Sequence, residues 1–174
     1  MLVADTATAT LSANTIAEHD VGIQVGGTAV VETDATTIST SAVAAVGYGE
    51  TSTGTVRGSS VDAAAGVGIE ITGSAQVTVD ANTVTGAGDA GLSVSESAQA
   101  TETGNVVTGR NVGIQVGGSA RADISGANVR DSALIGVLFA DQSSAAWREA
   151  RSSPAPPSAS SPVARRPRRS GTTR

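Results

Sequence analysis

Apolar and polar residues alternate along most of the chain, as in Ile69 and Ile71 or Val77 and Val79. This alternation is typical of β-strands that bury one face, and no stretch shows the three- or four-residue spacing of an amphipathic helix. Gly, Asn, Ser and Asp stand between the alternating pairs, and these residues favour sharp turns. The pattern therefore predicts an all-β fold in which short strands are joined by turns.

A four-residue motif returns along the chain, with successive copies 23, 23, 23, 22 and 23 residues apart. Its copies are Gly22–Val25, Ala45–Tyr48, Gly68–Ile71, Gly91–Val94, Gly113–Val116 and Gly136–Phe139. Three further sets of residues recur with this period, and each set is here called a ladder. One ladder is polar, one consists of small residues and one is aliphatic. They are Asn14, Thr36, Ser59, Asn82, Asn105 and Asn128; Ala7, Ala29, Ser52, Ala75, Ala98 and Ala120; and Ile16, Ile38, Val61, Val84 and Val107, followed by Arg130.

Each repeat is interpreted as one coil of a solenoid. About six coils of 22–23 residues are expected, with each strand pairing with its equivalents above and below at about 4.8 Å. For the Asn ladder we expect side-chain hydrogen bonds to the turn backbone and to the next Asn, with ligand or metal binding as the alternative. Because Ala45 occupies one position of the glycine ladder, that ladder indicates close steric approach.

Residues 81–120 read ANTVTGAGDAGLSVSESAQATETGNVVTGRNVGIQVGGSA, with Asn-x-Val/Ile, Gly-Ile-x-Val and Ser-Ala once per coil. Over about residues 3–147 the chain resembles the right-handed parallel β-helix repeats of the pectin-lyase-like superfamily. The resemblance implies kinship with pectate lyases, polygalacturonases, alginate epimerases, NosD-like proteins or carbohydrate-binding-and-sugar-hydrolase repeats, and the fold does not choose among their functions. A leucine-rich repeat is the structural alternative, although the chain has only five leucines.

Composition excludes several classes of site. Cys is absent and His19 is the sole histidine, which excludes disulfides, Cys-ligated zinc and multi-His metal sites. There is no apolar run of about 18 residues and no signal-peptide pattern, so the location stays open between the cytoplasm by default and a secreted parent protein. Residues 1–147 carry fifteen acidic residues and four arginines, a net charge of −11, so nucleic-acid binding by this part is not expected.

Catalytic motifs of the resembled families are missing, namely Asn-Thr-Asp, Asp-Asp and His-Gly for polygalacturonases and the Asp-His pairing of pectate lyases. We therefore expect no catalytic, cofactor-binding or metal-ligating residues and no cofactor. The predicted function is a non-catalytic scaffold or binding module for a protein or glycan partner. The alternative is a polysaccharide lyase or glycoside hydrolase, or its remnant, acting on acidic polysaccharide through turn carboxylates such as Asp62, Asp80 or Asp89.

Weaker candidate sites are weighed against ordinary structural roles. Asp34, Asp62 and Asp80 could form a cation edge, or be solvated turn carboxylates. Glu70 is expected to point outward, with Gln24 and Gln115 as its equivalents, which gives one carboxylate and no cluster. The remaining candidates are His19 in a turn beside Glu18 and Asp20, as a general base or an exposed loop residue; a basic spot of Arg57, Arg110 and Arg121; and the threonine run Thr6, Thr8 and Thr10, which resembles ice-binding arrays.

The two ends carry separate expectations. Val3 aligns with Val25, so the chain is expected to begin inside an uncapped coil, as a fragment would, and an uncapped edge allows self-association. A repeat domain over 1–147 and a disordered Pro/Ser/Arg-rich tail over 148–174 are predicted. The tail carries a net charge of +6. Its ARRPRR run has three interpretations: a polybasic arm for nucleic acid or anionic lipid, a segment lying on the acidic body, or a frameshifted low-complexity terminus.

Overall fold

The structure is a computed structural model that describes residues 1–62 and 65–148, so the predicted tail lies outside the described residues apart from Arg148. The described elements are β-strands in two sheets. The seven-stranded sheet contains β2 (Thr8–Ser12), β4 (Val30–Asp34), β6 (Thr53–Arg57), β9 (Gln76–Asp80), β12 (Gln99–Thr103), β15 (Arg121–Ser125) and β18 (Ser144–Arg148). β18 extends one residue beyond the predicted end of the repeats.

Each coil has three sides, and one of them belongs to the seven-stranded sheet. The strands of the other two sides form a single second sheet, because β3 and β5 each run continuously from one side to the next. Its members are β1 (Leu2–Val3), β3 (Thr15–Val25), β5 (Thr37–Tyr48), β7 (Ser60–Asp62), β8 (Val67–Ile71), β10 (Thr83–Val84), β11 (Ala90–Val94), β13 (Val106–Thr108), β14 (Val112–Val116), β16 (Asn128–Arg130) and β17 (Ile135–Phe139).

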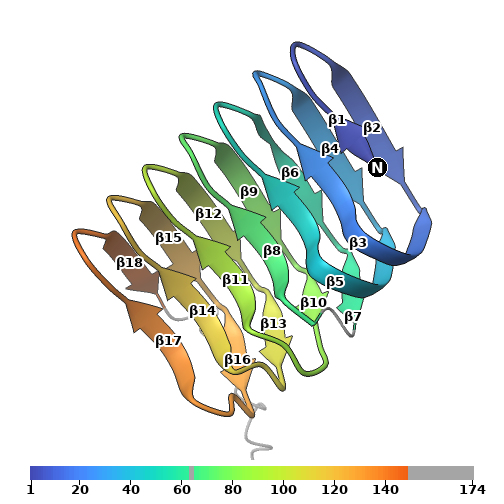
Figure 1. The fold of residues 1–174 in the computed structure, drawn as a ribbon. Helices are drawn as coiled ribbons and strands as arrows, with labels where there is room; N and C mark the ends of the chain where they lie inside the picture. The colour runs from blue at the N-terminus through green and yellow to red at the C-terminus, as the bar shows by residue number, and fades with distance from the viewer. Residues whose placement is uncertain (63–64, 149–174) are drawn as a thin grey trace, which may run out of the picture.

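The strand pairs of both sheets are parallel, with partners 22 or 23 residues apart. Figure 1 shows the coils stacked in chain order from β1 and β2, in blue, to β17 and β18, in orange and brown. The predicted equivalence of Gln24, Gly47, Glu70, Ser93 and Gln115 is the observed register. The all-β solenoid of about six coils is therefore confirmed.

The interior is filled by columns of small aliphatic side chains, with one aromatic exception. Tyr48 is fully buried between Val25 and Ile71 of its column, and its hydroxyl donates to the Val31 carbonyl oxygen at 2.8 Å. A Cβ added to Gly54 would lie 2.0 Å from the Val31 carbonyl oxygen and 2.8 Å from the Tyr48 hydroxyl oxygen. Gly54 therefore leaves room for both the Val31 backbone and the Tyr48 ring.

Asparagine side chains connect successive coils at the turn after the seven-stranded sheet. Asn82 donates from Nδ2 to the Val56 carbonyl at 2.8 Å and to Asn105 Oδ1 at 3.0 Å. The Asn82 backbone N–H donates to the same oxygen at 2.8 Å, and Asn105 Nδ2 donates to the Val79 carbonyl at 2.8 Å. The predicted hydrogen bonds to the turn backbone and to the next Asn are confirmed at these positions.

The last position of the polar ladder was predicted wrongly. Val106 pairs with Asn128 and Val107 with Val129, so Ala127 follows Asn105 on the ladder and Val129, not Arg130, continues the aliphatic column. The offsets from β12 to β15 and from β13 to β16 are 22 residues, whereas β14 and β17 are offset by 23. The additional residue therefore lies between β16 and β17, where regular spacing does not reveal it.

The turn before the seven-stranded sheet has a period of two coils that the sequence interpretation missed. Acidic residues and glycines alternate in the left-handed region: Asp5, Gly27, Glu50, Gly73, Glu96, Gly118 and Asp141. The backbone N–H of each glycine donates to the acid of the next coil, at 2.8–3.0 Å. A Cβ on Gly73 would lie 2.6 Å from the Glu50 backbone nitrogen, so the acidic turns can stack only on turns that lack a side chain.

Candidate functional site

The outward side of the seven-stranded sheet, here called the outer face, presents three columns of side chains. The register aligns Thr8, Val30, Thr53, Gln76, Gln99, Arg121 and Ser144; Thr10, Glu32, Thr55, Thr78, Thr101, Asp123 and Ala146; and Ser12, Asp34, Arg57, Asp80, Thr103, Ser125 and Arg148. Neighbours within a column are about 4.8 Å apart, the spacing of paired strands. The outer face is thus a regular array in two directions.

The outer face is rich in hydroxyl groups and carries charges of both signs. Ten of its twenty-one side chains are Ser or Thr, and its four carboxylates and three guanidinium groups give a net charge of −1. The acidic excess of the chain body lies elsewhere. Of the five arginines among the described residues, Arg57, Arg121 and Arg148 are on this face. The outer face therefore repels an anion less than the net charge of the body suggests.

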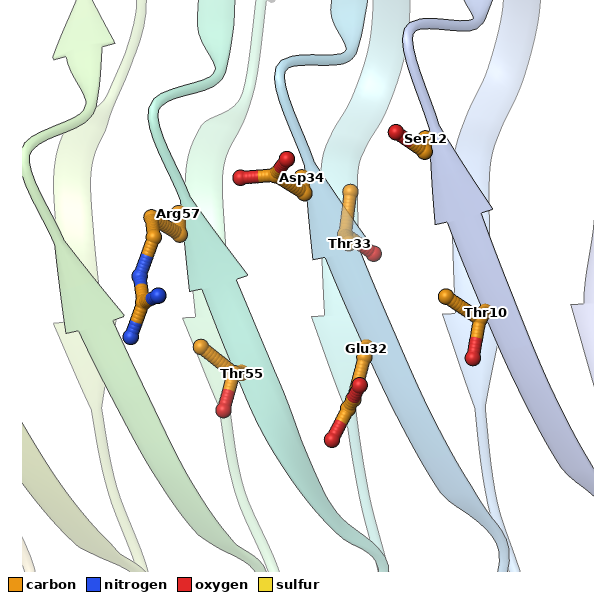
Figure 2. Close-up of a pocket in the computed structure, with 7 residues that line it drawn as sticks. All are labelled: Thr10, Ser12, Glu32, Thr33, Asp34, Thr55 and Arg57. Carbon is orange, nitrogen blue, oxygen red and sulfur yellow. The ribbon is translucent and has the colours of Figure 1, made fainter.

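A shallow pocket of about 350 Å³ lies on the outer face across β2, β4 and β6 (Figure 2). It is lined by Thr10, Ser12, Glu32, Thr33, Asp34, Thr55 and Arg57. Arg57 Nε lies 3.2 Å from Asp80 Oδ2 in an exposed ion pair, which contributes at most about 1 kcal/mol to stability. The pocket therefore combines hydroxyls, carboxylates and one guanidinium group that is easily redirected toward a ligand.

The predicted turn carboxylates are divided between two parts of the coil. Asp34 and Asp80 belong to one outer-face column with Arg57 between them, whereas Asp62 ends β7 in the other sheet. Asp62 Oδ1 accepts a hydrogen bond from the Thr85 hydroxyl at 3.0 Å. In residues 1–62 and 65–148, no three or more His, Asp or Glu side chains are grouped so that they could hold a metal ion.

Arg110 lies near the carboxylates of Asp62 and Asp89. It is fully buried and donates to the carbonyls of Gly66 at 3.3 Å and Thr85 at 3.1 Å, so it joins three coils. Burial lowers the pKa of Arg110, and the charges of Asp62 and Asp89 partly restore it. The structure thus does not bring Arg110 together with Arg57 and Arg121 as a basic spot, because Arg110 lies inside the solenoid.

His19 lies in β3, where the prediction placed a turn. It pairs with Ser41 beside an irregularity in the register, and its side chain is exposed, as are those of Glu18 and Asp20. Glu70 has the outward position expected, half-buried, with no carboxylate in the equivalent positions Gln24 and Gln115. Neither arrangement adds a cluster to the outer face.

Threonine recurs from coil to coil in the column of Thr10, but not in the column of Thr8. The column of Thr8 continues with Val30. The neighbouring column contains Thr55, Thr78 and Thr101 in three successive coils. Comparing the equivalents of Thr10 as well as those of Thr8 in each coil would have revealed this column.

Glu102 is a buried acid that the sequence interpretation missed. It lies in β12 at an inward position, between Val79 of β9 and Ile124 of β15, and its side chain is 1% exposed. Neither carboxyl oxygen has a hydrogen-bond partner. Burial raises the pKa of Glu102 to about 7, and the nearby Asn105 side chain lowers it by less. The signal in the sequence is an acid in a column that has an aliphatic residue in four of its six other positions.

The sequence model of a family described as "Right handed beta helix region" matches residues 2–149. The chain belongs to this family. Comparisons with curated proteins and with solved structures found no match. Right-handed β-helix membership supports a repeat scaffold or binding module and does not decide between catalytic and non-catalytic members. In the described part of the chain, no helix is long and apolar enough to cross a membrane.

Proposed function

We propose that this right-handed β-helix is a non-catalytic binding module whose outer face binds a glycan chain across the strands. The observation that carries the proposal is the array of ten hydroxyls in regular columns, with the pocket at Glu32, Asp34 and Arg57 at one end. Hydroxyl, carboxylate and guanidinium groups supply both donors and acceptors for sugar hydroxyls. The array repeats at about 4.8 Å, so a polymer can make the same contact at successive coils.

Charge and shape indicate which glycans bind. Residues 1–147 carry a net charge of −11, which disfavours polyanions at low salt, so neutral polysaccharides are the expected class. The outer face carries Val30 and Ala146 but no aromatic side chain. Binding therefore depends on many hydrogen bonds of modest strength, and affinity should increase with oligosaccharide length until the ligand spans the sheet.

The test is calorimetric titration of the full chain with a length series of neutral oligosaccharides and of oligogalacturonates. The double variant T55V/T78V removes two hydroxyls from one column without changing side-chain shape. A matched control, T37V/T83V, removes two exposed hydroxyls from the other sheet. We expect the first variant to bind at least about 10-fold more weakly and the control to bind within about twofold of the unmodified chain.

Three results would overturn the proposal. The first is the absence of binding to any glycan, including in the presence of calcium. The second is equal weakening by T55V/T78V and T37V/T83V. The third is turnover of a polyuronate that Asp80→Asn abolishes, which would establish the enzyme alternative in its place.

A further inference from the structure

Glu102 occupies a place where the fold offers an ionised carboxylate little, because only the Asn105 side chain favours the charged form. The inward position is aliphatic in the adjacent coils, Val79 and Ile124, and both carboxyl oxygens of Glu102 are buried without a hydrogen-bond partner. A carboxylate buried without partners costs several kcal/mol relative to water, whereas a neutral carboxyl costs much less. The packed state of β12 therefore favours the protonated form.

No opposite charge faces Glu102 from the strands that pack on β12, and the other charged groups nearby point away. The inward residues of β9 and β15 are Val77, Val79, Ala122 and Ile124. Asp80, Arg121 and Asp123 belong to the outer face. β13 has no titratable side chain, and Arg110 donates to the backbone carbonyls of Gly66 and Thr85.

We propose that Glu102 is a proton-dependent lock on the middle of the solenoid. When protonated, it allows β9, β12 and β15 to pack together; when it loses the proton, these three strands loosen while the first coils keep their packing. The inference does not depend on glycan binding, because Glu102 points into the core and away from the outer face.

The direction of the pH effect follows from linkage. The pKa of Glu102 rises from the ordinary value of 4.5 to about 7 on folding, so the native chain holds a proton that the unfolded chain has released. The stabilisation is fully present below about pH 4.5 and is lost as the pH rises through 7. This single group raises the unfolding equilibrium constant on the order of 100-fold between pH 5 and pH 8.

The test compares urea unfolding of the full chain, followed by circular dichroism from pH 5 to pH 8, among four proteins. They are the unmodified chain, E102Q, E102V and the control E70Q, which removes an acid from an outward column where other coils have Gln. Between pH 5 and pH 8, we expect the unfolding equilibrium constant to rise about 100-fold less in E102Q and E102V than in the unmodified chain. In E70Q the rise should equal that of the unmodified chain. E102V matches the aliphatic column and keeps the test valid if E102Q does not fold.

Hydrogen exchange, corrected for intrinsic rates, locates the effect. Protection of β9, β12 and β15 should fall with rising pH more than protection of β2 and β4, and E102V should abolish this difference. The proposal is overturned if E102Q and E102V unfold with the same pH dependence as the unmodified chain. It is equally overturned if protection falls uniformly along the solenoid.

Discussion

At the scale of single residues, the core is specified by pairs of side chains whose sizes compensate. Tyr48 fills space that Gly54 leaves empty in the same coil. Neither choice follows from the ladder to which its residue belongs, since the neighbours of Tyr48 in its column are Val25 and Ile71. Stability at this level should be a property of the pair and not of either residue.

Exchanging the two sizes tests this coupling. Gly54→Val alone should destabilise the protein by about 1–3 kcal/mol through overpacking, and Tyr48→Val alone by a similar or larger amount through a cavity. The double variant should recover about 1 kcal/mol relative to the sum of the two, because the Val31 carbonyl oxygen still crowds the new side chain. Urea unfolding measures all three free energies, and strictly additive losses would show that the two sites are independent.

At the scale of the turn elements, hydrogen bonds between coils depend on the correct ladder position. Asn105→Ala removes the acceptor of the Asn82 backbone N–H and the donor to the Val79 carbonyl, leaving buried polar groups without partners. The expected loss is about 2–4 kcal/mol. Asn128→Ala is the matched control, because Asn128 is exposed and lies one position past the ladder. The Asn128→Ala variant should change the free energy of unfolding by no more than about 0.5 kcal/mol. Equal losses in the two variants would instead support the alignment that places Asn128 on the polar ladder.

The alternation of acids and glycines predicts a second difference between turns. Gly73 and Gly104 both have positive φ, +69° and +64°, but a Cβ meets the Glu50 backbone at Gly73 and open space at Gly104. Both Ala substitutions carry the cost of the left-handed conformation, about 1–2 kcal/mol. Gly73→Ala should cost about 1–3 kcal/mol more, because the Glu50 turn must shift. Thermal unfolding of the two variants checks this, and identical midpoints would refute the stacking explanation.

At the scale of the whole molecule, the repeat made the coil, its period and most of the strand pairing predictable. Most like positions stack on their equivalents, so aligning the repeats also aligns most of the paired strands. Three features were missed for physical reasons. When the period changes by one residue, the sequence does not show at which point of the coil the change occurs, which is why Asn128 was placed on the ladder in place of Ala127. The acid–glycine alternation has a period of two coils, and Glu102 differs from its column.

The candidate site was predictable only in kind. Composition indicated a polar binding surface without catalytic motifs, but the three columns of the outer face became visible once the register was known. Asp34 and Asp80 share a column interrupted by Arg57, while Asp62 belongs to another sheet. Proximity in this fold depends on the phase within the coil, which separates carboxylates that look equivalent along the sequence.

The central claim is that residues one period apart stack into straight columns, and distances between spin labels test it most directly. The chain has no Cys, so label pairs at Thr10 with Thr55, Thr101 or Asp123 are unambiguous, and all four residues share one outer-face column. Backbone separations of about 10, 19 and 24 Å are expected for two, four and five coils. Distances that do not increase in steps of about 4.8 Å per coil would contradict the account.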